Sequence, residues 1–179
     1  MPKKILTFAA SNSSVSINRT LAEYAASLAQ DAEVTTLDIH DYEMPIYRHD
    51  REEESGIPKQ AHDFLARLGE ADALIIGLAE HNGLYSAAFK NLFDWCSRLG
   101  REVFQDKPMV LTATSTGPGG ASRVLDLAET AFPHFGGDVK AAFSLPLYDE
   151  KFDPEANGGA GKVTDADKDA ELRAAVALL

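Results

Sequence analysis

Residues 73–79 read ALIIGLA, and residues 109–114 read MVLTAT. Neither run alternates apolar with polar residues, as a strand with one exposed face does, so both are predicted to be central strands buried on both faces of a parallel sheet. Other short apolar runs precede and follow them, and longer amphipathic segments lie between the runs. This alternation is typical of βαβ units, in which helices cover both faces of a parallel sheet.

Five strands and five helices can be counted along the chain. Ser16 or Asn18 is expected to cap the first helix, Ser86 lies near the start of the third, and Thr164 with Asp165 precedes the last. The strict alternation predicts an α/β, flavodoxin-like three-layer sandwich, with a five-stranded parallel sheet of order 2-1-3-4-5. The predicted strands are 4–10, 33–38, 72–79, 108–114 and 139–144, and the predicted helices are 17–30, 58–69, 84–99, 120–132 and 165–178.

Composition narrows the class of protein. The 179 residues, 45% of them hydrophobic, suit one domain over residues 1–179. The 28 acidic and 17 basic side chains give a net charge of -11, which disfavours nucleic acid and anionic membranes as partners. The apolar run 5–10 is too short for a membrane span and is better explained as a buried first strand. We therefore predict a cytoplasmic protein without a nucleic-acid or membrane partner.

The cysteine and the histidines give no sign of a metal site. Cys96 is the only cysteine, and it falls in the apolar stripe of a predicted helix, so we expect it to be buried rather than nucleophilic. His40, His49, His62 and His134 lack the spacing of metal ligands and are expected to be structural or exposed. No metal ligand is predicted.

The loop after the first strand (loop 1, residues 10–18) reads ASNSSVSIN. In a doubly wound sheet, ligands bind beyond the carboxyl ends of the strands where the winding direction reverses. The hydroxyl and amide groups of loop 1, with the free N–H groups of the next helix, predict a cradle for an anion. Four serines and two asparagines are more than a helix cap requires. GxGxxG is absent, which argues against the usual dinucleotide-binding fold.

Two further loops are expected at the same edge of the sheet. The segment after the third strand reads AEHNGLYSAAFKNLFDW (79–95), and its loop (loop 2, residues 79–83) holds the turn pair Asn82 and Gly83. The loop after the fourth strand (loop 3, residues 114–122) reads TSTGPGGAS, whose glycines let the backbone lie close to a ligand. Either loop alone is also typical of an ordinary turn, but three such loops at one edge predict a binding site.

Together the loops resemble the NADPH-dependent FMN reductase family. The family pattern is GSxRxxSxN, then PEYNxSxxGxLKNxxDW, then a glycine-rich loop, and the similarity covers most of residues 5–145. Ala10, Ser13, Ala79 and His81 replace the family's glycine, arginine, proline and tyrosine. The residues in register with the pattern are Ser11, Ser16, Asn18, Glu80, Asn82, Lys90, Asn91, Asp94 and Trp95, and Ser86 lies two positions after the family's serine.

The resemblance implies a flavoprotein oxidoreductase that binds FMN and uses NADPH or NADH as hydride donor. Because Ser13 replaces the arginine, the preference between the two donors is left open. His81 could lie against the flavin, face a substrate or be a polar surface residue. The residues implied to contact FMN are Ser11, Ser13, Ser16, Ile17, Asn18, Ala79, Glu80, His81, Asn82, Gly83, Ser115, Thr116, Gly117, Gly119 and Gly120.

The resemblance also implies a homodimer or a dimer of dimers, with residues of a neighbouring subunit near the flavin. Segment 42–57 is expected to be a long loop with exposed-looking aromatic residues, including Tyr42 and Tyr47. It could form this contact or pack on its own chain. Glu52, Glu53 and Glu54 are interpreted as a solvated run, and residues 153–162 as a loop.

The implied reaction passes hydride to the flavin and then electrons to a small-molecule acceptor: a flavin, a quinone, an azo compound or a metal ion. No side-chain acid or base is required, so no catalytic residue is assigned. The alternative is a flavodoxin-like electron carrier or regulatory flavin-binding module without NAD(P)H turnover. Such proteins cover the flavin with aromatic rings, whereas these loops offer few, Tyr85 being the nearest. A flavin-free scaffold would require the loop similarity to be accidental.

Overall fold

A five-stranded parallel sheet forms the centre of the protein in the computed structural model, which describes residues 1–179. The strand order β2-β1-β3-β6-β7 confirms the predicted flavodoxin-like order 2-1-3-4-5. All residues of the central strand β3 are buried, as its continuous apolar run predicted. The strands are β1 (Lys3–Ala10), β2 (Ala32–Leu37), β3 (Ala73–Leu78), β6 (Lys107–Thr114) and β7 (Gly137–Leu145).

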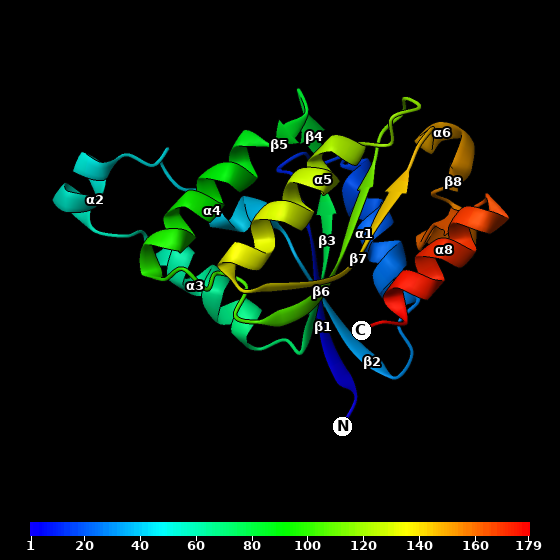
Figure 1. Cartoon of the computed structure of the whole chain (residues 1–179), viewed down its shortest axis with the longest axis horizontal. Helices are drawn as coiled ribbons and strands as arrows, with labels where there is room; N and C mark the ends of the chain where they lie inside the picture. The colour runs from blue at the N-terminus through cyan, green and yellow to red at the C-terminus, as the bar shows by residue number, and fades with distance from the viewer.

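Helices cover both faces of this sheet (Figure 1). On one face lie α1 (Ile17–Ser27) and α8 (Ala166–Val176), and on the other lie α3 (Lys59–Gly69), α4 (Ala87–Leu99) and α5 (Ser122–Ala131). Alternate residues of each strand point to opposite faces. Ile75 of β3 therefore packs under α1, whereas Leu74 and Ile76 pack under the other three helices.

The three helix caps that the sequence suggested are present. Ser16, Ser86 and Asp165 each accept a hydrogen bond from the third backbone N–H that follows, at 3.2, 3.1 and 3.1 Å. The predicted start of the third helix at residue 84 is wrong, because residues 80–85 form a hairpin of β4 (Glu80–His81) and β5 (Leu84–Tyr85). Helix α4 begins only after its cap.

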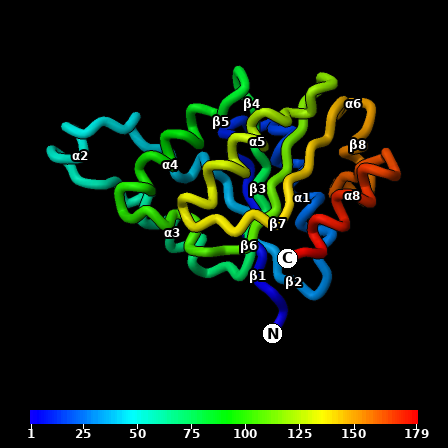
Figure 2. Tube along the Cα trace, viewed as in Figure 1, coloured from blue at the N-terminus to red at the C-terminus, as the bar shows by residue number.

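Two segments expected to be loops, residues 42–57 and 153–162, contain regular structure. Segment 42–57 begins at the last residue of the 3-10 turn η1 (Ile39–Tyr42). It contains α2 (His49–Ser55), which stands out from the body of the chain (Figure 2). Helix α2 has no buried residue, so no apolar period marks it in the sequence. The remaining short elements are η2 (Phe132–Phe135), α6 (Tyr148–Lys151), β8 (Phe152–Asp153), α7 (Ala156–Gly159) and β9 (Lys162–Val163).

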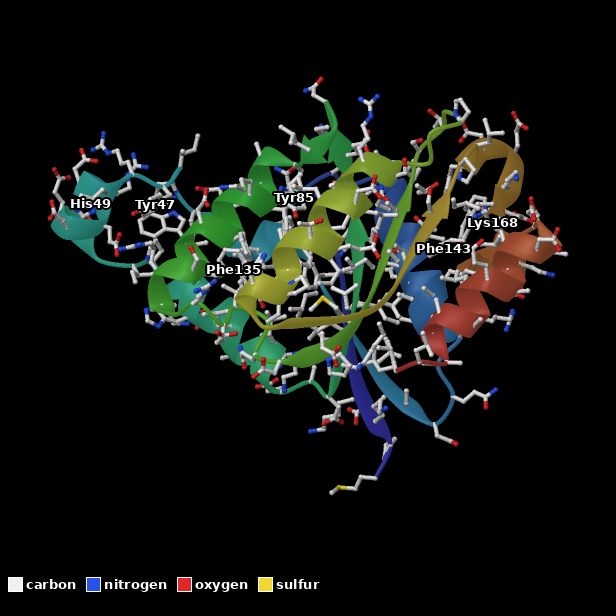
Figure 3. All side chains as sticks on the ribbon, viewed as in Figure 1. Tyr47, His49, Tyr85, Phe135, Phe143 and Lys168 are labelled. Carbon is white, nitrogen blue, oxygen red and sulfur yellow. The ribbon has the colours of Figure 1, made fainter.

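Segment 42–57 packs on its own chain. The N–H of Tyr47 donates to Asn91 Oδ1 at 2.8 Å, and the indole N–H of Trp95 donates to the Pro45 carbonyl at 2.7 Å. Tyr47, which lies between α2 and α4 (Figure 3), also donates to Glu52. Tyr42 and Tyr47 are therefore half-buried rather than exposed as expected, because Tyr42 packs edge-on against Phe64 of α3 and Tyr47 against Trp95 of α4.

The run of three glutamates is also only partly solvated. Glu53 and Glu54 are exposed, but Glu52 accepts hydrogen bonds from the Tyr47 hydroxyl at 3.1 Å and from Arg98 Nε at 2.9 Å. Cys96 is buried as expected, and burial raises the pKa of its thiol to about 12. No helix of the chain combines the length and the apolar character needed to cross a membrane.

Helix α1 lies very close to the sheet at Gly77 of β3. A Cβ built on Gly77 would lie 2.4 Å from the carbonyl oxygen of Asn18 and 3.0 Å from the Cβ of Ala22, both in α1. Only glycine lets the helix lie this near the strand. The short distance between α1 and β3 therefore depends on residue 77 being glycine, which has no Cβ.

We predict that Gly77→Ala destabilises the protein by about 1–3 kcal/mol, because the added methyl group pushes α1 away from a well-packed core. Urea unfolding measures the change. The matched control is Gly100→Ala, since a Cβ there meets no atom within 4 Å and the backbone is extended, with φ 169°. Equal midpoints for both variants would contradict the close approach.

The N-cap of α8 predicts a pH dependence of stability. Lys151 Nζ donates to Asp165 Oδ2 at 2.7 Å, and this bond, with the N–H of Lys168, holds the pKa of the Asp165 carboxyl below its ordinary value. The charged cap therefore stabilises the fold above the ordinary carboxyl pKa, and the benefit is lost as pH falls through the lowered value.

Asp165→Asn carries no charge at any pH, so its deficit in melting temperature relative to the wild type should shrink as the solution is acidified. Thermal unfolding followed by circular dichroism from neutral to acidic pH measures this gap. Asp126→Asn, whose side chain makes no hydrogen bond or ion pair, serves as the control. A gap that stays constant with pH would show that the carboxylate charge does not contribute.

Candidate active site

Loop 1 follows β1 and leads into the N-terminus of α1. Ser11 Oγ accepts from the N–H of Ser13 at 3.2 Å, and Ser13 Oγ accepts from the N–H of Val15 at 3.3 Å, so two successive side-chain turns shape the loop. The backbone N–H groups of Ser14, Ser16 and Ile17 have no acceptor in the chain. Free donors at a helix N-terminus are suited to binding an anion.

Loop 2 is the turn of the β4–β5 hairpin. Asn82 and Gly83 have positive φ values of 56° and 81°, the conformation of a tight hairpin turn that favours an Asn-Gly pair. The positive φ expected for Gly83 is confirmed. His81 and Asn82 are exposed, and Ala79 is buried under the turn. The hairpin therefore presents the polar side chains of His81 and Asn82 at its tip, beside the exposed Leu84.

Loop 3 lies open at the carboxyl end of β6. A Cβ on Gly117 or Gly119 would meet no atom within 4 Å, and the N–H groups of Thr116, Gly117 and Gly119 have no acceptor in the chain. Ser115 Oγ donates to the Gly117 carbonyl at 3.2 Å. Gly120 differs, because it packs inward and a Cβ there would lie 2.3 Å from Ser144 Oγ. Free N–H groups and open space thus coincide at the first part of the loop.

Side-chain hydrogen bonds hold the three loops together. The Asn18 amide donates to the Thr114 carbonyl at 3.2 Å and accepts from its N–H at 2.8 Å, which joins α1 to the end of β6. Ser86 Oγ donates to the Ala10 carbonyl at 2.8 Å. Glu80 accepts from the N–H of Val124 in the first turn of α5 at 3.1 Å. Asn18 and Glu80 therefore fix the three loops relative to one another without facing the open site themselves.

Neither Tyr85 nor Trp95, the large aromatic residues that follow loop 2, faces the open site. Tyr85, labelled in Figure 3, stacks on Phe132 with ring centroids 5.9 Å apart and lies edge-on to Phe89 of α4. Burial raises the pKa of its phenol to about 12, and its hydroxyl has no hydrogen-bond partner. Trp95 is fully buried. The exposed surface of the three loops thus carries no phenylalanine, tyrosine or tryptophan ring, and the imidazole of His81 is its one aromatic group.

The anion cradle of loop 1 has no free cation beside it. Arg19 is held by Asp38 at 2.8 Å and by Glu23 at 3.3 Å. Burial raises the pKa of Asp38, but hydrogen bonds from the His40 N–H and from Arg19 outweigh it, so the pKa lies below its ordinary value. The carboxylate thus stays charged and neutralises the arginine. An anion bound here is held by neutral dipoles alone.

The loop after β2 also reaches this edge, which the sequence interpretation missed. Asn12 of loop 1, Met44, Ile46 and Ala87 with Ala88 of α4 line part of a largely apolar cavity of about 310 Å³. The sequence signal for this cavity was the presence of apolar residues, such as Met44 and Ile46, in a segment that has no helical or strand periodicity. Loop 3 is supported by the segment after β7 as well, where the N–H of Leu147 donates to the Gly117 carbonyl at 3.1 Å.

Comparisons with known proteins agree with this geometry. The sequence profile of the family described as NADPH-dependent FMN reductase matches residues 3–146. A Mycoplasma pneumoniae protein described as a homolog of MG342 is 29% identical over 158 residues, which cover 86% of this chain and 93% of that protein. The quinone reductase of Escherichia coli is 31% identical over 108 residues, which cover 60% of this chain and 55% of that protein.

A solved structure supports the same assignment. FerB from Paracoccus denitrificans, a flavoenzyme NAD(P)H:(acceptor) oxidoreductase, superposes with a TM-score of 0.76 and 25% sequence identity. The superposition covers 98% of this chain and 94% of FerB, so the whole sandwich is shared. With the profile match over most of the sheet and all three loops, the chain belongs to the NADPH-dependent FMN reductase family.

Proposed function

We propose that this chain is an FMN-containing reductase that takes hydride from NADPH or NADH and passes electrons to a small acceptor. The observation that carries the proposal is the set of free backbone N–H donors in loops 1 and 3, which in loop 3 border open space at Gly117 and Gly119. The acceptor proposed is a quinone, as for the Escherichia coli relative, or else a flavin, an azo compound or a metal ion. Catalysis needs no side-chain acid or base in this scheme.

The residues present fit FMN. The N–H groups of Ser14, Ser16 and Ile17 and the hydroxyl of Ser13 would hold the phosphate, for which the N-terminus of α1 supplies a favourable dipole. The N–H groups of Thr116, Gly117 and Gly119 would bind the polar edge of the ring. His81, Asn82 and Gly83 would contact the ring from the hairpin.

When bound, FMN supplies the chemistry, because it accepts hydride and donates electrons. The chain binds and orients it: Asn18, Glu80 and Ser86 keep the three loops at fixed separations through their hydrogen bonds. Tyr85 points inward and would not cover a bound flavin, which favours a reductase over an electron carrier with aromatic covers. Donor and acceptor would then bind in turn at one site.

Two further proposals concern the assembly and the location of the protein. A homodimer or dimer of dimers is favoured by Ile46, whose side chain is 78% exposed beside the apolar cavity at loop 1. The net charge of -11 favours a protein without nucleic-acid partners. We also propose that residues 1–179 act as one domain in the cytoplasm.

We predict that the purified protein retains added FMN through desalting and that NADPH or NADH then bleaches the flavin absorption band under anaerobic conditions. Readmission of air or addition of a quinone should restore the band. A protein that keeps FMN but is not reduced by either donor would support the electron-carrier alternative. A protein that retains no FMN would contradict the proposed site.

Loop 3 allows a sharper test of where the flavin lies. Gly119→Val should leave the free energy of unfolding nearly unchanged, since a Cβ there meets no protein atom, yet weaken FMN binding about tenfold or more, or ~1.4 kcal/mol. The added side chain occupies the space proposed for the ring.

Fluorescence titration with FMN and urea unfolding measure the two effects separately. Gly100→Val is the matched control, because that glycine is equally open but lies at the C-terminal end of α4. Unchanged FMN affinity in Gly119→Val would show that the flavin does not bind against loop 3.

A further inference from the structure

Arg123 differs from every other arginine of the chain. Seven of the eight arginines make an ion pair or a hydrogen bond to a backbone carbonyl. The Arg123 guanidinium makes none, and no carboxylate oxygen lies within 4.0 Å of it. In a chain with a net charge of -11, a cation left without a carboxylate is the exception.

The position of Arg123 links it to the site. It is the second residue of α5, directly after loop 3, and its side chain is exposed. A Cβ built on Gly83 would lie 3.6 Å from Arg123 Cδ and 3.9 Å from Arg123 Nη1, so the side chain lies against the tip of loop 2. The free guanidinium therefore stands where loops 2 and 3 meet.

This placement is unfavourable for helix stability. A cation in the first turn of a helix interacts unfavourably with the helix dipole. The Glu80 carboxylate accepts a hydrogen bond from the N–H of Val124 and does not pair with Arg123. No local contact of Arg123 offsets this cost. Two lysines also lack a side-chain partner, but Lys4 is near the amino end of β1 and Lys162 is in β9, so Arg123 is the free cation at loops 2 and 3.

We propose that Arg123 binds a phosphate group of the nicotinamide donor. This inference rests on the proposed function. The single phosphate of FMN is assigned to the free N–H groups of loop 1, whereas Arg123 lies beside the loops assigned to the ring. A donor that lies on the ring there extends outward with its pyrophosphate and, in NADPH, its 2′-phosphate. Arginine binds such groups through paired N–H donors.

Arg123→Gln tests the proposal, with Lys4→Gln as the matched control that removes the same charge at the opposite end of the sheet. FMN affinity and the urea midpoint should match the wild type in both variants. In FMN-loaded Arg123→Gln, KM for the donor should rise about tenfold or more with little change in kcat, and Arg123→Lys should recover part of the loss.

A binding measurement that needs no turnover accompanies the kinetics. Calorimetric titration with 2′,5′-ADP and with ADP-ribose should show weaker binding to Arg123→Gln than to Lys4→Gln. A loss confined to NADPH and 2′,5′-ADP would assign the 2′-phosphate, and a loss shared by NADH and ADP-ribose would assign the pyrophosphate. Either result supports the proposal.

Two negative results are distinguishable. If the wild-type chain binds FMN but neither donor reduces it, the proposed function fails and this inference fails with it. If both donors reduce the wild type and Arg123→Gln at equal KM, only the role of Arg123 is overturned. A change limited to KM for an anionic acceptor, with donor KM unchanged, would likewise overturn it and assign the guanidinium to the acceptor.

Discussion

The approach of α1 to the sheet at Gly77 is the constraint on which the site depends. Because β3 carries no Cβ at this point, the first turn of α1 lies against the strand, and the Asn18 amide reaches both the N–H and the carbonyl of Thr114. These bonds join the start of α1 to the end of β6. A buried amide that satisfies two backbone groups is costly to remove, so the separation of loops 1 and 3 is held firmly. The ligand-binding edge thus inherits its dimensions from a packing contact in the core.

Electrostatics divide the site into two parts. Around loop 1, Arg19 is neutralised by Asp38 and Glu23, and an anion meets only backbone dipoles and hydroxyl groups. Beside loops 2 and 3, Arg123 is left free. A tightly held cofactor gains from neutral donors that fit it closely, whereas an incoming charged substrate gains from a long-range attraction in a chain that is otherwise strongly acidic.

The aromatic residues of the chain build its core rather than its site. Tyr85 stacks on Phe132, and Trp95 is buried with its indole N–H bonded to Pro45. The hairpin β4–β5 causes this arrangement, because alternate residues of a strand point to opposite sides and Tyr85 falls on the inner one. His81 and Asn82 are left outside, where they are free to contact the flavin in the proposed site.

The sequence by itself determined the layers, the strand order and the three loops, because these follow from local periodicity and turn residues. The continuous run at 73–79 and the caps at Ser16, Ser86 and Asp165 are readable within a few positions of chain. Only the tertiary structure decided which loop residues position the site and which are free to bind. Asn18 and Thr114 lie 96 residues apart, and Glu80 reaches α5 across 44. Helix α2 could not be predicted from the sequence, because it has no apolar face. The lack of an ion-pair partner for Arg123 could not be predicted either, because it depends on where the carboxylates lie in the folded chain.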